Sequence, residues 1–157
     1  MKRTTILAAV IAALLTPSLF APAQAADKGW RYWGYYQSAA GSNTWKAAMT
    51  GPTVDIADGS VEGWIFTFSS DDIPSTPPSV KPDFKSICGT TKAQPGFKRV
   101  GLVIDFGKQA YAPKGEKIKK TIVRCVLTAN DSQGIDVLAY EVKVRSANSG
   151  LICGFNG

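Results

Sequence analysis

Two stretches of the chain alternate apolar and polar side chains, and this period of two predicts β-strands. The longer one covers residues 98–106 and turns four apolar side chains to one side: Val100, Leu102, Ile104 and Phe106. The other covers residues 61–68 and aligns three aromatic side chains: Trp64, Phe66 and Phe68. Val103 is apolar too but points the opposite way, which indicates partial burial of both strand faces. We therefore expect the chain to fold around a sheet that is packed on both faces here.

The remaining patterns predict shorter elements around this sheet. Strands are expected over residues 30–37, 44–49, 121–128 and 151–155. Short helices are expected over residues 82–89 and over residues 134–143, where apolar residues recur at helical spacing. Residues 69–82 hold four prolines and no periodicity, so they predict a partly extended loop. This order, without βαβ repetition, indicates a single small α+β domain: a mostly antiparallel sheet with one or two short helices.

The first 25 residues have the organisation of a cleavable signal peptide. Lys2 and Arg3 precede an apolar run over residues 6–15, and Ala23-Gln24-Ala25 supplies the small residues that a signal peptidase reads. Ten apolar residues are too few to cross a membrane, which needs about 20. We expect residues 1–25 to be removed and residues 26–157 to form one secreted domain, extracellular or associated with the cell envelope. No second long apolar stretch follows, so no membrane-spanning segment is expected in the mature chain.

The charge of the expected mature chain is mildly positive. Removing residues 1–25 leaves 16 basic and 12 acidic residues, a net charge of +4. The basic residues gather in and after one loop: Lys114, Lys117, Lys119, Lys120 and Arg124. So small an excess on a secreted chain does not predict nucleic acid as a partner. The run is either a solvated loop or an anchor to an anionic cell-envelope polymer.

Three cysteines lie in the expected mature chain: Cys88, Cys125 and Cys153. Outside the cytoplasm a disulfide is permitted, and an odd count means at most one intramolecular bridge and one remaining thiol. Three pairings are possible, and all three stay open. A zinc site is not expected, since the cysteines are far apart and the chain has no histidine.

The side chains of the chain do not assemble a catalytic pattern. The absence of histidine removes Ser-His-Asp and Cys-His arrangements and the commonest general base. Asp71 and Asp72 are adjacent, which favours a solvated turn over the two separated carboxylates of a glycosidase. No glycine-rich phosphate loop is present either. We therefore predict a protein that is not an enzyme and that has no catalytic residue, cofactor or metal.

Aromatic residues are dense in the first half of the mature chain, where all four tryptophans fall between residues 30 and 64. Alternation in the strand over residues 30–37 places Trp33 and Tyr35 on one face and three aromatic residues on the other: Trp30, Tyr32 and Tyr36. Large rings with a polar tip suit stacking on sugars or flat macrocycles, although the same rings could fill the core. The candidate ligand contacts are Trp33, Tyr35, Trp45 and Trp64.

Several segments together resemble a family of small secreted or surface proteins of actinobacteria. They are Tyr32-Trp33, Gly63–Phe66, Asp83–Cys88, Lys98–Gly107, Arg124–Val126 and Leu151–Cys153. The genes of this family are found near energy-coupling-factor transporter genes. The resemblance thus implies a role in capturing a vitamin or metal-bearing nutrient, with a membrane transporter as partner.

Residues 123–157 separately resemble the end of β-grasp ligand-binding domains of the kind found in cobalamin carriers. There a strand, a turn, a helix and a closing strand follow in this order, and Gly134–Ala139 and Leu151–Gly157 match it. The hypothesis that follows is a non-enzymatic extracytoplasmic protein that binds a small-molecule ligand. The alternative is an envelope-associated protein that binds an anionic wall polymer or a protein partner.

Overall fold

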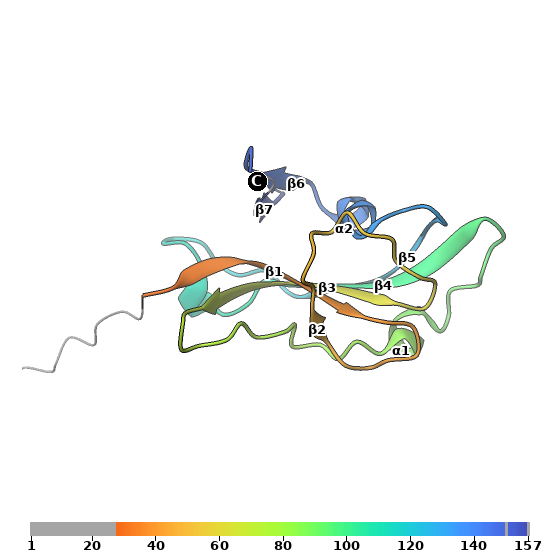
Figure 1. Cartoon of the computed structure of the whole chain (residues 1–157), viewed down its shortest axis with the longest axis horizontal. Helices are drawn as coiled ribbons and strands as arrows, with labels where there is room; N and C mark the ends of the chain where they lie inside the picture. The colour runs from red at the N-terminus through yellow and green to blue at the C-terminus, as the bar shows by residue number, and fades with distance from the viewer. Residues whose placement is uncertain (1–27, 150, 157) are drawn as a thin grey trace, which may run out of the picture.

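The computed structural model describes residues 28–149 and 151–156, so the predicted signal peptide over residues 1–25 lies outside the described residues. A five-stranded sheet forms the centre of the domain (Figure 1). In order across it, the strands are β2 (Lys46–Ala47), β1 (Trp30–Ser38), β3 (Val61–Ser69), β4 (Phe97–Asp105) and β5 (Ile122–Ala129). The other elements are α1 (Phe84–Cys88), the 3₁₀ helix η1 (Gln109–Tyr111), α2 (Gly134–Glu141), β6 (Val144–Ser146) and β7 (Ile152–Phe155).

The sheet is mixed, because β3 and β4 run parallel while the other neighbouring strands within it pair antiparallel. A parallel pair cannot be joined by a tight turn, since the chain must first return to the starting end of the sheet. Residues 70–96 make this return and contain the proline-rich loop and α1. The predicted α+β class is confirmed, as are the predicted strands and both helices.

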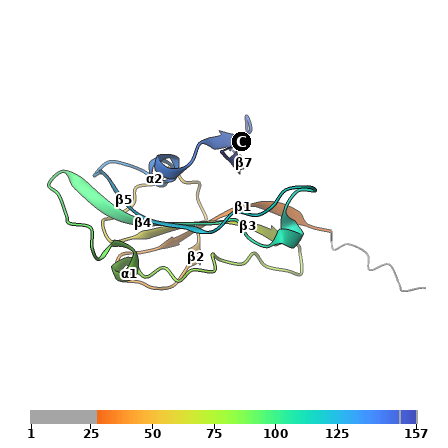
Figure 2. The same cartoon turned by 180° about the vertical axis from the view of Figure 1, so that it is seen from behind.

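One face of the sheet is covered by α2 and the hairpin of β6 and β7 (Figure 1, and from behind in Figure 2). The alternation of residues 98–106 produces this packing, since Val100, Leu102 and Ile104 are all fully buried under the covering elements. The covering elements contribute Val137, Leu138, Val142 and Phe155. The start of α2 is held in place by the neighbouring loop, where the backbone N–H of Ile135 donates to the carbonyl of Pro52 (2.9 Å).

The opposite face of the sheet is covered by α1, the proline-rich loop and Trp45. The indole N–H of Trp45 donates to the carbonyl of Val80 (2.9 Å), and its ring lies against Gly63 of β3. A Cβ at residue 63 would stand 2.6 Å from that ring, so a larger side chain would displace Trp45. The loop is also tied to the sheet by Ser79, whose backbone N–H donates to the carboxylate of Asp105 (2.9 Å). Because the proline-rich loop covers this face of the sheet, Val103 on the same face is fully buried.

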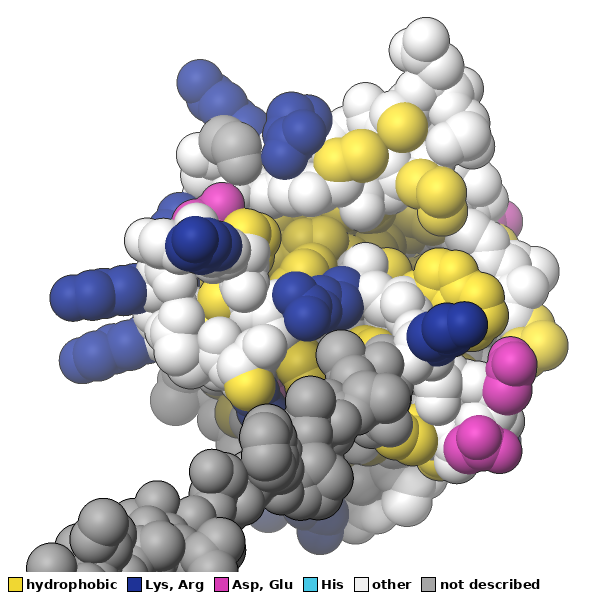
Figure 3. All heavy atoms as spheres, turned by 90° about the vertical axis from the view of Figure 1, so that its left-hand side faces the viewer, with side chains coloured by type: hydrophobic (Ala, Val, Ile, Leu, Met, Phe, Trp, Pro, Cys, Tyr) yellow, Lys and Arg dark blue, Asp and Glu magenta, His cyan; other side chains and the backbone are white. Residues whose placement is uncertain are grey.

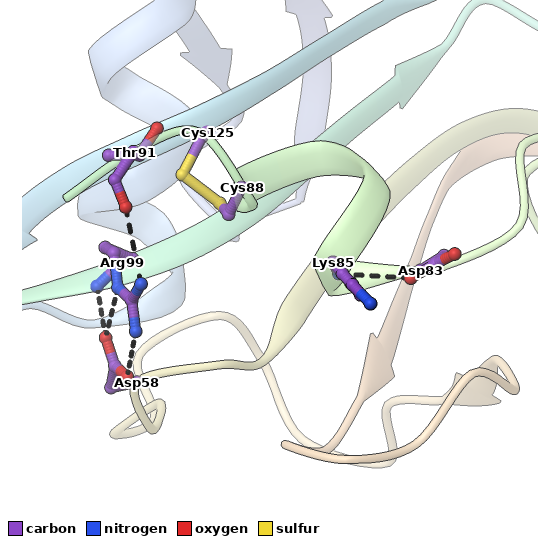
Figure 4. Close-up of a disulfide and its surroundings, with 7 residues drawn as sticks. All are labelled: Asp58, Asp83, Lys85, Cys88, Thr91, Arg99 and Cys125. Atoms are coloured by element: carbon purple, nitrogen blue, oxygen red, sulfur yellow. Dashed lines mark hydrogen bonds and ion pairs between the residues drawn. A yellow bond between two sulfur atoms is a disulfide. The ribbon is translucent and has the colours of Figure 1, made fainter. Parts of the chain in front are cut away.

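A disulfide joins α1 to the edge strand β5. Cys88 at the end of α1 is bonded to Cys125 on β5 (Figure 4). Cys153 keeps a free thiol. The prediction of one bridge and one remaining thiol is confirmed, and the structure selects one of the three pairings. Asp83 caps α1 by accepting from the backbone N–H of Lys85 (3.0 Å). The disulfide is compatible with an extracellular location.

Lys98 is a buried cation at the start of β4, only 5% exposed. Its ammonium group donates to three backbone carbonyls, those of Ile56 (2.7 Å), Asn130 (2.8 Å) and Ser132 (2.7 Å). A buried charge needs such partners, because desolvation without them costs several kcal/mol. Lys98 thereby ties the loop before β3 and the turn before α2 to the end of the sheet.

The C-terminal segment follows the predicted order of strand, turn, helix and closing strand. The closing strand β7, however, pairs with β6 in a separate two-stranded sheet and not with β5. β6 is an element that the sequence patterns did not predict, and the second helix ends at Glu141 instead of Lys143. None of the helices in the described residues is long and apolar enough to pass through a membrane.

The disulfide leads to a prediction about thiol chemistry and stability. All three cysteines lie among the described residues, so denatured wild-type protein should titrate with one thiol, and Cys153→Ser should remove it. Replacing Cys88 and Cys125 together with alanine should lower the free energy of unfolding by about 2–5 kcal/mol, because the open chain gains conformational entropy. Urea unfolding of this variant beside Cys153→Ser measures the loss. Three titratable thiols, or equal stability of the two variants, would contradict the assignment.

Candidate functional site

The four aromatic residues predicted as ligand contacts are divided between the two faces of the sheet. Trp33, Tyr35 and Trp64 share the face that α2 and the hairpin cover, because Tyr35 pairs with Trp64 and Trp33 with Phe66 across β1 and β3. Trp45 lies on the opposite face against Gly63. The structure therefore brings three of them together and separates the fourth.

Two of the three grouped residues, Tyr35 and Trp64, make their main contacts with other side chains inside the protein. Trp64 is 2% exposed and stacks on Tyr35 with ring centroids 4.5 Å apart. The Tyr35 hydroxyl donates to the carboxylate of Glu62, so it too is engaged inside. Trp33, by contrast, borders a cavity that neither Tyr35 nor Trp64 lines.

Glu62 is a buried carboxylate beside this stack. It is 1% exposed and accepts hydrogen bonds from Tyr35 and from the side-chain amide of Gln37 (3.2 Å). Burial raises the pKa of Glu62 above its ordinary value, although both hydrogen bonds act in the other direction. Burial, followed by the nearby charge of Glu62, also raises the pKa of Tyr35. The cluster keeps Tyr35 in its protonated, hydrogen-bond-donating form.

The cavity next to Trp33 lies at the end of the sheet, between the β6–β7 hairpin and the loop over residues 106–121. We call it the aromatic hollow, after the four rings that line it: Trp33, Phe66, Phe106 and Phe155. Its volume is about 190 Å³. Figure 3 shows this end of the molecule, with hydrophobic side chains at the base of a recess and Lys and Arg side chains around it.

Trp33 stands at the centre of these rings. Its centroid lies 4.0 Å from that of Phe155, 5.5 Å from that of Phe106 and 5.6 Å from that of Phe66. The Phe106 ring meets Trp33 edge-on at 86°, an arrangement that aromatic quadrupoles favour. Trp33, Phe66 and Phe106 are each only half-buried, so part of their apolar surface remains open in the hollow.

The loop that borders the hollow leaves the sheet at Gly107. This residue has a φ of +74°, and a Cβ here would stand 2.0 Å from the carbonyl oxygen of Phe66. Only glycine fits both conditions. The loop then brings Lys117 and Lys119 to the hollow, where the ammonium group of Lys119 lies 5.8 Å from the centre of the Phe106 ring.

Three cationic side chains line the hollow against one carboxylate, Glu116. We call these three the basic rim: Lys117, Lys119 and Arg145. The free thiol residue Cys153 borders the same space. The predicted basic run is thus split, because Arg124 lies on β5 and pairs with Glu141 of α2 (3.4 Å).

Two other candidate regions lack this combination. A second cavity of about 380 Å³ borders Glu62 and Gln37 at the opposite end of β1, but its lining holds mostly small side chains and no aromatic ring. Asp71 and Asp72 are both exposed in the bend that follows β3. Among the described residues, no three Cys, Asp or Glu side chains gather as metal ligands.

Most of the hollow is not predictable from the sequence patterns. Phe66 and Phe106 were placed on strand faces by alternation, but nothing in the sequence set them beside Trp33. Phe155 and Arg145 come from a hairpin whose first strand was not predicted. The usable signal was the grouping of lysines after residue 113, which does supply two members of the basic rim.

These features define a small α+β domain with an aromatic hollow and a positively charged edge. The chain belongs to the SCO2322-like domain family, whose match covers residues 25–157. The family bears a Streptomyces name, in agreement with the expected actinobacterial family. Neither the curated proteins nor the solved structures contain a match to the chain.

The buried carboxylate leads to a prediction about pH. Folding raises the pKa of Glu62 above its ordinary value of 4.5. Between pH 4.5 and this raised pKa, Glu62 is therefore protonated in the folded protein but ionised in the unfolded chain. Its contribution to stability is full below pH 4.5 and is lost as the pH rises through the folded pKa, by up to about 1.4 kcal/mol per pH unit. Glu62→Gln, which cannot titrate, should gain stability relative to wild type over this rise.

Urea unfolding of both proteins from pH 4.5 to pH 8 measures this difference. The matched control is Glu116→Gln, which changes an exposed carboxylate. Parallel pH profiles of wild type and Glu62→Gln would show that Glu62 has the same pKa in the folded and unfolded protein, contrary to the prediction.

Proposed function

We propose that the chain is a non-enzymatic extracytoplasmic binding protein whose ligand site is the aromatic hollow. The observation that carries the proposal is the half-open set of rings around Trp33, in a recess bordered by cationic side chains of a loop and a hairpin. Ligand cavities characteristically combine an apolar lining with a few polar groups that orient the ligand. The implied role is the capture of a vitamin or metal-bearing nutrient, with a membrane transporter as partner.

The assignment of Trp33 can be tested by intrinsic tryptophan fluorescence against corrinoids, other vitamins and wall glycans, corrected for absorbance. A ligand in the hollow should change the emission saturably. Trp33→Leu should weaken its binding about 2–10-fold, because an aromatic contact contributes about 0.5–1.5 kcal/mol beyond area burial. Trp30→Leu is the matched control, since Trp30 is 63% exposed on the other face of the same strand.

The outcomes separate the possible sites. Binding that survives Trp33→Leu but is lost in Trp45→Leu would move the site to the opposite face of the sheet. A panel without any response would favour the second candidate function below.

The second candidate is an envelope-associated interaction protein. The observation that favours it is a loop with four exposed lysines: Lys114, Lys117, Lys119 and Lys120. Its partner would be an anionic wall polymer or an acidic protein surface. The attraction would act over about one Debye length, which shortens as the salt concentration rises.

This candidate predicts that the protein sediments with purified cell wall at low salt. The bound fraction should fall steeply between about 0.01 M and 0.15 M salt, where the Debye length shrinks from about 30 Å to about 8 Å. Replacing all four lysines with glutamine should abolish sedimentation. Binding that is insensitive to salt would rule out the electrostatic version.

A further inference from the structure

We propose that the aromatic hollow selects a small planar anion, namely a one- or two-ring aromatic carboxylate. This inference rests on the proposed function and specifies the chemical class of its ligand. The ring would lie against Trp33 and its neighbouring phenylalanines, and the carboxylate would face the basic rim.

The size of the hollow sets the upper limit for the ligand. Its volume of about 190 Å³ is below the range of about 300–1,000 Å³ that is usual for drug-sized ligands. A corrin ring with its side groups does not fit inside, whereas one or two fused rings do. The half-buried rings of Trp33 on β1, Phe66 on β3 and Phe106 just after β4 offer such a ligand an aromatic surface.

The charges around the hollow set the sign of the ligand. Lys117, Lys119 and Arg145 face a single acid, Glu116, which leaves an excess of two positive charges in the lining. The ion pairs found in the described part of the chain are those of Arg99 and Arg124, so the three cations of the rim are left without a carboxylate partner there. They are therefore available to a ligand carboxylate, and Arg145 can hold it through two parallel hydrogen bonds.

The arrangement also explains why the ligand should be both aromatic and charged. A neutral ring would leave the three cations without a partner, and a compact anion such as phosphate would leave the rings uncovered. An aromatic acid satisfies both parts at once, with its charge near the solvent-exposed edge, where desolvation costs little.

The test is an NMR titration of the full chain with three probes of matched size. 1-Naphthoate is the planar anion, 1-naphthamide is its neutral counterpart, and decahydronaphthalene-1-carboxylate carries the charge on two fused rings that are not aromatic. We expect 1-naphthoate to shift the indole N–H signal of Trp33 and to bind about tenfold more tightly than either other probe. Tenfold corresponds to about 1.4 kcal/mol, which is within the contribution of one charge-assisted hydrogen bond.

Charge variants assign the effect to the rim. The double variant Lys117→Gln and Lys119→Gln leaves Arg145 in place, so it should weaken the binding of 1-naphthoate and reduce, without removing, its advantage over 1-naphthamide. The matched control removes Lys114 and Lys120, which have the same charge and the same loop but do not line the hollow. Equal losses in the two double variants would overturn the proposed contact with the rim.

The thiol of Cys153 supplies a measurement that needs no variant. It borders the hollow, so 1-naphthoate should slow its alkylation by iodoacetamide in the wild-type protein, and 1-naphthamide at the same concentration should do so less. Equal binding of the acid and the amide would overturn the ligand class while leaving the binding site intact. If neither binds, the ligand class is wrong, and the fluorescence panel with Trp33→Leu decides the proposed function separately.

Discussion

The packing of Phe155 against Trp33 and Trp64 is the contact on which the candidate site depends. The β6–β7 hairpin forms a sheet of its own, so strand pairing does not attach it to the five-stranded sheet. Phe155 lies 4.0 Å from Trp33 and 6.1 Å from Trp64, measured between ring centroids, and it is 6% exposed. These aromatic contacts hold the hairpin residues that line the hollow against the sheet residues that line it. They also place Arg145, the partner of Gly154 in the hairpin, at the edge of the same space.

The domain stabilises its two faces by different means. The α2 face is an apolar core in which the strands supply long aliphatic and aromatic side chains. The opposite face is covered by the proline-rich loop and α1. These segments are held by hydrogen bonds from Trp45 and Ser79 and by the disulfide between Cys88 and Cys125. A loop without secondary structure must satisfy its backbone groups individually, which explains the density of such bonds here. The sheet lies between these two layers, and the hollow lies at one end of it.

Buried polar groups connect segments of the domain through hydrogen bonds, although their desolvation costs free energy. Lys98 and Glu62 are both nearly inaccessible to solvent, and each has several hydrogen-bond partners. Lys98 donates to carbonyls of the loop before β3 and of the turn before α2, whereas Glu62 orients Tyr35 beneath the start of that helix. Gly134 meets the Tyr35 hydroxyl so closely that a Cβ would stand 2.3 Å from it. The position of α2, and with it the hairpin that follows, is thus coupled to this buried polar cluster.

Local patterns in the sequence determined most of the elements of this protein, although not β6, and only the tertiary structure decided how they meet. Alternation places Trp64 and Leu102 on definite strand faces, Gly89 ends α1, and prolines keep residues 69–82 out of regular structure, because these are properties of neighbouring residues. The absence of histidine and the presence of three cysteines likewise limit the chemistry directly. The partner of Cys88, the separation of Trp45 from Trp33 and the union of Phe155 with Arg145 depend on strand order and on a parallel crossover. Contacts between residues far apart in the chain arise from packing, which no local pattern records.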